Sequence, residues 1–457
     1  MTVQAPAVAM TGLASERLAE HVVGLRFGDL PAEVVERAKD LITYDLGVAF
    51  AGRFTEAGRA AVALAHDLSA GGGSSTILGE RRRATMLDAI FANSELMGLD
   101  DDHHLASKVR VGRVSQSAAW ALGEHEHAPG REVITALVLA YDTACKLAEP
   151  QQMAGGYAHV PHKCAFAPFA PAAVAVRLLR YGQERAARSI ARAAHFGMGL
   201  NAGLEDAFTF SLVARNGVMA ALLPEANGTG ILRAIDGPHG LYAALFGGPP
   251  EGLEASLSTL GREFSILGAS TKRYPGSASH IAPLEAGRAL YERERPEPDE
   301  VQSVVATLPD EFRGRFAYQE TRMDRAAEPN DEDIAVGASL QLKLAILLVE
   351  GRVVPRPTLV HWRDPRVQAA LPKVTLTFEP LPVDRARIEL VTKDGRTLRA
   401  DGAVVPYPKG DWSAWLRKDG ERFLSEAKLA RLERLITHLE DVDDFAEVMA
   451  CVVPDRP

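Results

Sequence analysis

The strongest constraint on the fold is a change of hydrophobic pattern partway along the 457-residue chain. Up to Gly268, apolar residues recur at helical spacing, as in the segment 31–52, PAEVVERAKDLITYDLGVAFAG, where Pro31 begins a helix after Asp29. Many of these segments are rich in alanine, so the helices can approach one another closely, and an α-helical domain is predicted. Three further helices are predicted at residues 131–147, 170–179 and 184–196.

Beyond Gly268 the period changes to that of β-strands. The predicted elements are strands at 301–308 and 374–378, a helix at 331–350 and a hairpin at 387–400. The hairpin prediction depends on the turn sequence Lys393-Asp394-Gly395-Arg396. Because strands and helices interleave, an α+β domain is expected here.

After Pro406 the pattern returns to helix, with an amphipathic segment at 426–438, and this tail can rejoin the first domain. We therefore expect a mainly α protein with an inserted α+β domain. The predicted domains are a helical domain at 1–268, an α+β domain at 269–403, and C-terminal helices at 404–457 that return to the helical domain.

Composition and charge limit the class of partner. The chain is 47% hydrophobic and 24% charged, as in globular proteins, and its net charge of −9 disfavours nucleic acid or an anionic membrane as a partner. It contains no apolar stretch of 18 residues, and residues 1–12 lack the features of a signal peptide, so a cytoplasmic protein is expected. Cys145, Cys164 and Cys451 are widely spaced, which predicts buried free thiols.

The densest group of ionisable residues lies in the segment 92–112, ANSELMGLDDDHHLASKVRVG. Three aspartates, from Asp100 to Asp102, are followed by His103 and His104. Crowded carboxylates cost stability unless cations or donors compensate them, and histidine is the side chain best suited to move a proton near neutrality. The segment follows a helical run and predicts a catalytic loop on a scaffold. The alternative is a solvated acidic turn.

A second cluster lies at 271–280, TKRYPGSASH, where the predicted domains meet. Lys272 supplies a cation, Tyr274 a hydroxyl donor, and His280 either a base or a structural hydrogen bond. Ligands bind preferentially at domain junctions, which favours a functional interpretation. The alternative is an ordinary linker with a surface lysine.

A third cluster lies at 155–164, GGYAHVPHKC, in which His159 and His162 are three residues apart. That spacing is compatible with a metal site, but no nearby Asp or Glu offers a third ligand, so a single histidine acting as proton donor fits better. His195, flanked by an alanine and a phenylalanine, is interpreted as a packed core histidine.

With its three clusters, the chain resembles the MmgE/PrpD family of methylcitrate dehydratases and cis-aconitate decarboxylases. This family also includes an iminodisuccinate epimerase. The segment 31–52 resembles the family's opening helices, and DAIFANSELMGLDDDHH resembles its helix leading into an aspartate-rich loop. The segment 213–247 is similar to the family's Ala-Arg-x-Gly region, and TKRYPGSASHIAPLEA to the motif that begins its lid domain. The likeness covers nearly the whole chain in the same order.

The resemblance implies a helical domain formed from both termini, an inserted lid domain, a homodimer, and a cleft between the domains. It also implies chemistry without a metal or an organic cofactor. The residues that it implicates are Asp100 and Asp101 in the acidic loop, His162 or alternatively His159, Lys272 and Tyr274, His280, and Tyr318 in the lid.

Two departures from the family pattern bear on the substrate. The acidic loop of the family continues to a histidine followed by proline or glycine, whereas this chain has Lys108 and Arg110, and arginine does not shuttle protons near pH 7. A lysine and a histidine normally precede the Ala-Arg-x-Gly region, whereas this chain has the acidic and aromatic segment 205–210, EDAFTF. Because buried carboxylates need cations, we expect a smaller, less charged or partly apolar substrate, such as one bearing an amine or guanidine that pairs with Glu205 or Asp206.

The expected function is that of a cofactor-independent lyase, a dehydratase or decarboxylase, that moves a proton next to a carboxylate or carbonyl of a small organic acid. The expected catalytic residues are His103, His104, His162, Lys272 and Tyr274, and the expected substrate-binding residues are Asp100, Asp101, Lys108, Arg110, His159, Asp206, His280 and Tyr318. An isomerase, epimerase or cyclase with the same enolate-like chemistry is the first alternative. A non-catalytic binding protein on this scaffold is the second.

Overall fold

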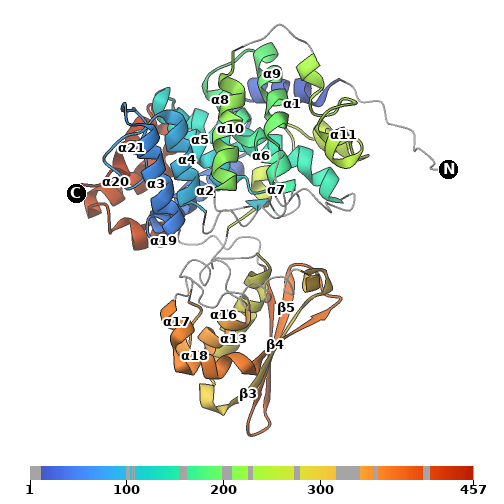
Figure 1. The fold of residues 1–457 in the computed structure, drawn as a ribbon, viewed down its shortest axis with the longest axis vertical. Helices are drawn as coiled ribbons and strands as arrows, with labels where there is room; N and C mark the ends of the chain where they lie inside the picture. The colour runs from blue at the N-terminus through green and yellow to red at the C-terminus, as the bar shows by residue number, and fades with distance from the viewer. Residues whose placement is uncertain are drawn as a thin grey trace, which may run out of the picture. The chain divides into compact units, whose positions relative to one another are not determined.

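The chain divides into two compact units, which we call the helical unit and the α+β unit (Figure 1). The helical unit comprises Met1–Thr271 together with Gly410–Pro457, and the α+β unit comprises Lys272–Lys409. The computed structural model describes residues 12–98, 103–104, 107, 109–153, 162–197, 208–224, 230–271, 278–314, 340–354, 359–404 and 412–455. These residues confirm the prediction of a mainly α protein with an α+β part. None of the helices among them combines the length and the apolar character needed to cross a membrane.

Helices in the helical unit pack through small side chains. A Cβ atom at Gly52, the last residue of α2, would lie 1.9 Å from the carbonyl oxygen of Leu96 in α4, so these two helices touch backbone to backbone. In α8 the sequence FAPAAVAVRL buries nearly every position. The longer helices of this unit are α1 (Ala14–Gly24), α2 (Ala32–Gly52), α3 (Glu56–Leu68), α4 (Met86–Leu96), α5 (Gly112–His125), α6 (Gly130–Met153), α8 (Phe169–Leu178), α9 (Gln183–Ala193) and α10 (Thr209–Leu222).

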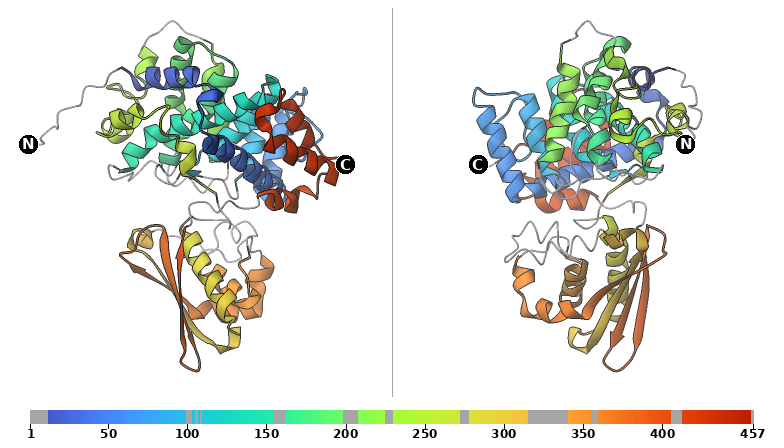
Figure 2. Two further views of the ribbon diagram at one scale, coloured as in Figure 1. Left: turned by 180° about the vertical axis from the view of Figure 1, so that it is seen from behind. Right: turned by 45° about the vertical axis from the view of Figure 1, so that its right-hand side comes forward.

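The first two C-terminal helices pack against α2, near the other end of the chain, as the red and blue ribbons in Figure 2 show, and the last packs against α5. The Trp412 ring lies edge-on to Tyr44 with centroids 4.8 Å apart. The Lys39 ammonium donates to the carbonyl oxygen of Thr437 at 2.9 Å and lies 3.1 Å from the Glu440 carboxylate. The helical unit is therefore completed by α19 (Trp412–Gly420), α20 (Glu426–Thr437) and α21 (Ala446–Cys451).

The α+β unit has a four-stranded sheet in the order β4-β3-β5-β6. Its strands are β3 (Val301–Pro309), β4 (Val374–Glu379), β5 (Arg385–Thr392) and β6 (Thr397–Ala403). Strand β3 pairs parallel with β4 and antiparallel with β5, and β5 pairs antiparallel with β6. One face of the sheet carries α13 (Ile281–Glu294) and α16 (Leu340–Glu350), and alternation along β5 buries Ala386, Ile388 and Leu390 on that face (Figures 1 and 2).

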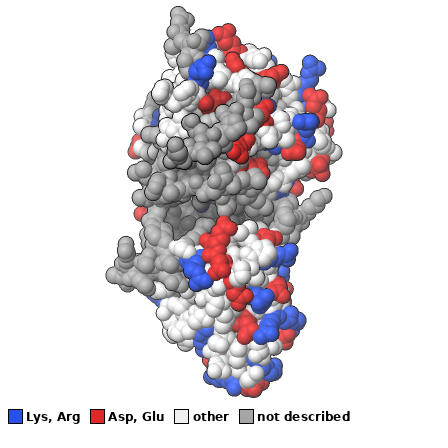
Figure 3. Space-filling model, turned by 90° about the vertical axis from the view of Figure 1, so that its right-hand side faces the viewer, with Lys and Arg blue, Asp and Glu red and all other residues white. Residues whose placement is uncertain are grey.

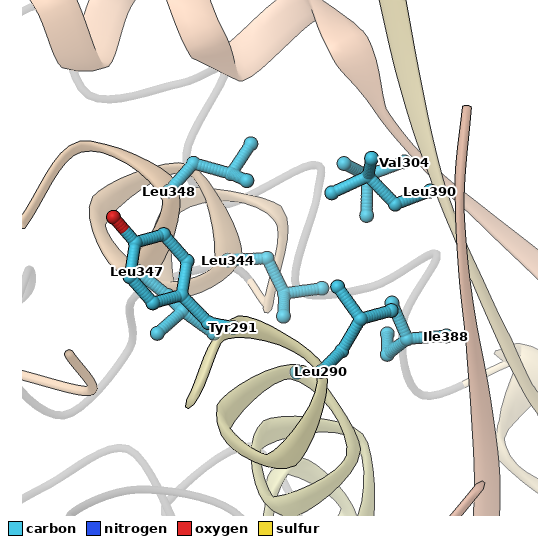
Figure 4. Close-up of a pocket in the computed structure, with 9 residues that line it drawn as sticks. Leu290, Tyr291, Val304, Leu344, Leu347, Leu348, Ile388 and Leu390 are labelled. Atoms are coloured by element: carbon cyan, nitrogen blue, oxygen red, sulfur yellow. The ribbon is translucent and has the colours of Figure 1, made fainter. Parts of the chain in front are cut away.

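A small cavity remains in the core of the α+β unit, between the helices and the sheet (Figure 4). Its walls are apolar except for the Tyr291 hydroxyl, so it lacks the converging polar groups of a binding site for an organic acid. On the face of this unit that Figure 3 shows, acidic and basic side chains are interspersed. The residues lining the cavity are Gly287, Leu290, Tyr291, Val304, Leu344, Leu347, Leu348, Ile388 and Leu390.

The predicted hairpin forms between β5 and β6. Gly395 has a φ of +87°, in the left-handed region that favours glycine, which explains its place in the turn. The Asp394 carboxylate accepts hydrogen bonds from the Thr392 hydroxyl and from Arg396, whose Nε lies 2.8 Å away. The hydrogen bond from Thr392, followed by those from Arg396, lowers the pKa of Asp394 to about 2.

Replacement of Asp394 by Asn removes the charge that these donors stabilise. Because the pKa of Asp394 is lower in the folded chain (about 2) than in an unfolded chain (about 3.9), the wild-type advantage is full above about pH 5 and decreases as the pH falls toward 2. We expect the difference in the free energy of unfolding between wild type and Asp394→Asn to shrink between about pH 6 and about pH 3 in urea titrations. A difference that stays constant over this range would contradict the assignment.

Candidate functional site

A two-residue strand pair in the helical unit joins the acidic loop to the residues just before the segment 271–280. Strand β1 (His103–His104) pairs antiparallel with β2 (Ala269–Ser270), and His103 lies opposite Ser270 and His104 opposite Ala269. The two histidines of the acidic loop therefore lie beside the chain that leads into the lysine-tyrosine-proline motif. The structure describes the backbone of these histidines and not their side chains.

Buried polar side chains from three helices hold the segment that ends in β2. The Arg37 guanidinium in α2 donates to the carbonyl oxygen of Ala269 at 2.5 Å. The Asp142 carboxylate in α6 is fully buried, and it accepts a hydrogen bond from the backbone N–H of Ser265 at 2.7 Å. Its other oxygen lies 3.0 Å from Nε2 of His21 in α1. The position of β2, and with it that of His103 and His104, therefore depends on α1, α2 and α6.

Replacement of Asp142 by Ala should destabilise the helical unit, because it leaves the Ser265 N–H and the His21 ring buried without their acceptor. We expect a loss of about 1–3 kcal/mol in the free energy of unfolding, measured by urea denaturation. Glu132→Ala on the same helix is the matched control, because Glu132 and its partner Arg177 are partly exposed, and it should cost less than about 1 kcal/mol. Equal effects of the two substitutions would contradict the assigned role of Asp142.

Arg110, the predicted replacement for the family's histidine, lies against an aromatic side chain of α10. Its guanidinium carbon is 5.2 Å from the ring centroid of Phe210, and the arginine is half-buried. The Phe208 ring, just before α10, stacks on Phe91 of α4 with centroids 6.0 Å apart. Phe210 thus places an aromatic ring next to a guanidinium, an arrangement suited to a carboxylate with an apolar neighbour.

In the α+β unit, His280 forms a buried pair with a residue that sequence reasoning missed. His280 ends the short helix η6 (Ala278–His280) and is 2% exposed, and Lys343 of α16 is 4% exposed. The Lys343 Nζ lies 3.4 Å from Nδ1 of His280. The available sequence signal was a lone lysine inside the apolar helical run LQLKLAILL. An amine beside an imidazole can hold a proton or bind an anion.

The structure describes only part of the predicted site. His162 opens α7 (His162–Phe166), and its side chain is not described, although Cys164 and Phe166 in the same helix are buried. His195 is exposed, so its interpretation as a core residue was wrong. In the described ranges, no three His, Cys, Asp or Glu side chains gather as metal ligands would. The predicted residues outside these ranges are Asp100, Asp101, Lys108, His159, Asp206, Lys272, Tyr274 and Tyr318.

The chain is similar to known proteins over most of its length. A family model described as the MmgE/PrpD N-terminal domain matches residues 16–253. This range includes the acidic loop, Arg110, His162 and α10. The chain is also 23% identical to the cis-aconitate decarboxylase-like protein oryM of Aspergillus oryzae, over 96% of this chain and 97% of that protein.

Proposed function

The chain belongs to the MmgE/PrpD family, and we propose that it is a cofactor-independent lyase of the dehydratase or decarboxylase type. The observation that carries this proposal is the family match over residues 16–253, which spans the acidic loop and α10. Similarity to a decarboxylase-like protein along nearly the full length of both chains supports the same class of reaction. The substrate in this proposal is a small organic acid.

The chemistry proposed is proton transfer at a carbon next to a carboxylate or carbonyl. Such a step passes through an enolate-like state, so it needs an acid or base with a pKa near neutrality and cations where negative charge develops. His103 or His104, together with His162, fits the first requirement by residue type, and Arg110 and Lys272 fit the second. In the same proposal Tyr274 donates to a substrate oxygen, and Asp100 and Asp101 orient the histidines.

The proposed substrate differs from citrate-like tricarboxylates. Each carboxylate that is taken out of water needs a cation or a set of oriented donors. Arg110 lies against the Phe210 ring, and Phe208 and Phe91 stack close to the start of α10. An acid with fewer charges and an apolar part matches these surroundings better.

The test measures how fast the full chain turns over each member of a panel of small organic acids that includes cis-aconitate. Substitution of both His103 and His104 by Gln, or of His162 by Gln, should lower kcat by about 10²–10⁴-fold, the contribution of general acid–base catalysis. The matched control is His195→Gln, because His195 is exposed, and it should leave turnover unchanged. Full activity in both test variants would contradict the proposed roles.

The same assay, run in deuterium oxide with mass analysis, separates the lyase from its nearest alternative. A lyase releases carbon dioxide or water as it incorporates or loses label. Exchange of deuterium without release of a fragment would instead indicate an isomerase, epimerase or cyclase acting through the same enolate-like state.

We expect Lys343, whose buried amine lies beside His280, to take part in the same reaction. Lys343→Met keeps a long, flexible side chain in the core of α16, so we expect the packing to be preserved. Turnover should nevertheless fall at least about tenfold, because the amine that holds a proton or binds an anion is gone. Lys373→Met is the control, since Lys373 binds the backbone carbonyl of Pro298 in the same unit. Unchanged turnover in Lys343→Met, with a normal melting curve, would exclude this role.

A further inference from the structure

A buried ion pair joins the two helices that flank the acidic loop. Glu95 lies in the last turn of α4 and Arg113 in the first turn of α5, their charged groups are 2.8 Å apart, and both side chains are 3% exposed. Nε of Arg113 also donates to the carbonyl oxygen of Ser94 at 3.0 Å. The pair therefore fixes both ends of the segment 97–111, which carries His103, His104 and Arg110.

The same ion pair is tied to α10. The Ser211 hydroxyl donates to the Glu95 carboxylate at 2.6 Å and lies 3.0 Å from the Arg113 guanidinium. Helices α4, α5 and α10 pack against one another (Figure 1). Because Phe210 precedes Ser211 in the chain, this hydrogen-bonded group also holds the backbone from which the Phe210 ring extends.

Two guanidinium groups contact the Phe210 ring. The guanidinium carbon of Arg113 lies 5.6 Å from the Phe210 ring centroid, and that of Arg110 lies 5.2 Å from it. Phe210 is buried, whereas Arg110 is half-buried. The order of contacts is thus a buried ion pair, then a buried ring, then a guanidinium nearer the surface.

We propose that Phe210, Arg113 and Glu95 are positioning residues that hold Arg110 in one orientation, as the binding group for a single carboxylate attached to an apolar carbon chain. A guanidinium that lies over a ring still has its N–H groups in its own plane, where they can form two parallel hydrogen bonds to a carboxylate. Because the ring beside them is apolar, these surroundings suit an apolar chain better than further carboxylates. This inference rests on the proposed function in one respect, namely that Arg110 contacts the substrate.

Stability alone does not account for this arrangement. Removing both charges of an ion pair from water is costly, and apolar side chains of similar volume often replace a buried pair without loss of stability. An apolar replacement does not fix the orientation of these groups. The hydrogen bonds from Arg113 to Ser94 and from Ser211 to Glu95 do, because a hydrogen bond depends on the angle between its partners as well as on their distance.

The test observes Arg110 directly, through the Nε–Hε nuclear magnetic resonance signal of the isotopically labelled full chain. The signal is assigned by its loss in Arg110→Lys. We expect a ring-current shift in the wild type that disappears in Phe210→Leu, which keeps an apolar side chain and removes the aromatic face, and that persists in Phe210→Tyr. Phe54→Leu is the matched control, because the Phe54 ring lies 3.6 Å from the guanidinium of Arg422, and it should leave the Arg110 signal unchanged. An Arg110 signal that is identical in wild type and Phe210→Leu would overturn the inference.

The ligand class is tested by titrating two acids against the same signal, hexanoate as an apolar monocarboxylate and cis-aconitate as a tricarboxylate. Hexanoate should shift the Arg110 signal, and its affinity should fall about fivefold in Phe210→Leu, as expected for the loss of a cation–π contact. Glu95→Gln should weaken binding as well, whereas Glu132→Gln, at the partly exposed pair with Arg177, should not. If neither acid shifts the signal, or only cis-aconitate does, the proposed ligand class is wrong.

Failure of the positioning inference can be distinguished from failure of the proposed function. If no acid is turned over but the Phe210→Leu and titration results are as expected, the lyase proposal fails and Arg110 remains a positioned carboxylate-binding group. If turnover is normal while the Arg110 signal does not respond to Phe210→Leu, the positioning inference alone fails.

Discussion

The pairing of β1 with β2 is the contact on which the predicted site segments of the helical unit depend. Two residues on each side form this pair, far fewer than an isolated strand pair needs to be stable in water. It persists because Arg37 and Asp142, both buried, bind the backbone of the β2 segment. Inside a protein such polar contacts are strong when they are satisfied and costly when they are broken, so they fix one arrangement of the backbone.

Several buried polar side chains of the helical unit bind the segments that leave its helices. Glu95 and Arg113 stand at the ends of α4 and α5, and Asp142 reaches from α6 to the segment before β2. The helices themselves pack through alanine and glycine, as at Gly52, where a side chain would collide with α4. Close apolar packing holds the scaffold together, and desolvated hydrogen bonds orient the segments that leave it. The core of the α+β unit is more uniformly apolar, and Lys343 with His280 forms a polar exception within it.

Sequence reasoning succeeded where the signal was local. Helix α2 begins directly after Pro31, and the β5–β6 hairpin turns at Gly395, because a fixed φ in one case and a left-handed φ in the other are properties of single residues. Cys145, Cys164 and Cys451 are buried free thiols, as predicted.

The structural features that the sequence did not predict depend on contacts between residues that are far apart in the chain. Lys343 pairs with His280, and Ser211 contacts Glu95. In both pairs, the sequence around one residue does not predict the other. His195 was misjudged because apolar neighbours in the sequence do not determine which way a side chain points at the end of a helix. For the acidic loop, the site prediction comes from the sequence, the family match covers the segment, and the structure adds the helices that hold its two ends.

The discontinuity of the helical unit has a consequence for the order of events during synthesis. Residues 272–409 form a contiguous unit and leave the ribosome before residues 410–457. At about 5–20 residues per second, synthesis of residues 272–409 takes roughly 7–28 s, and Trp412 can reach Tyr44 only after it. Until then the face of α2 around Tyr44 and Gly47 lacks the helix that covers it in the finished chain. The nascent protein therefore exposes an apolar surface for as long as the α+β unit takes to emerge, and in this interval chaperone binding or aggregation competes with folding.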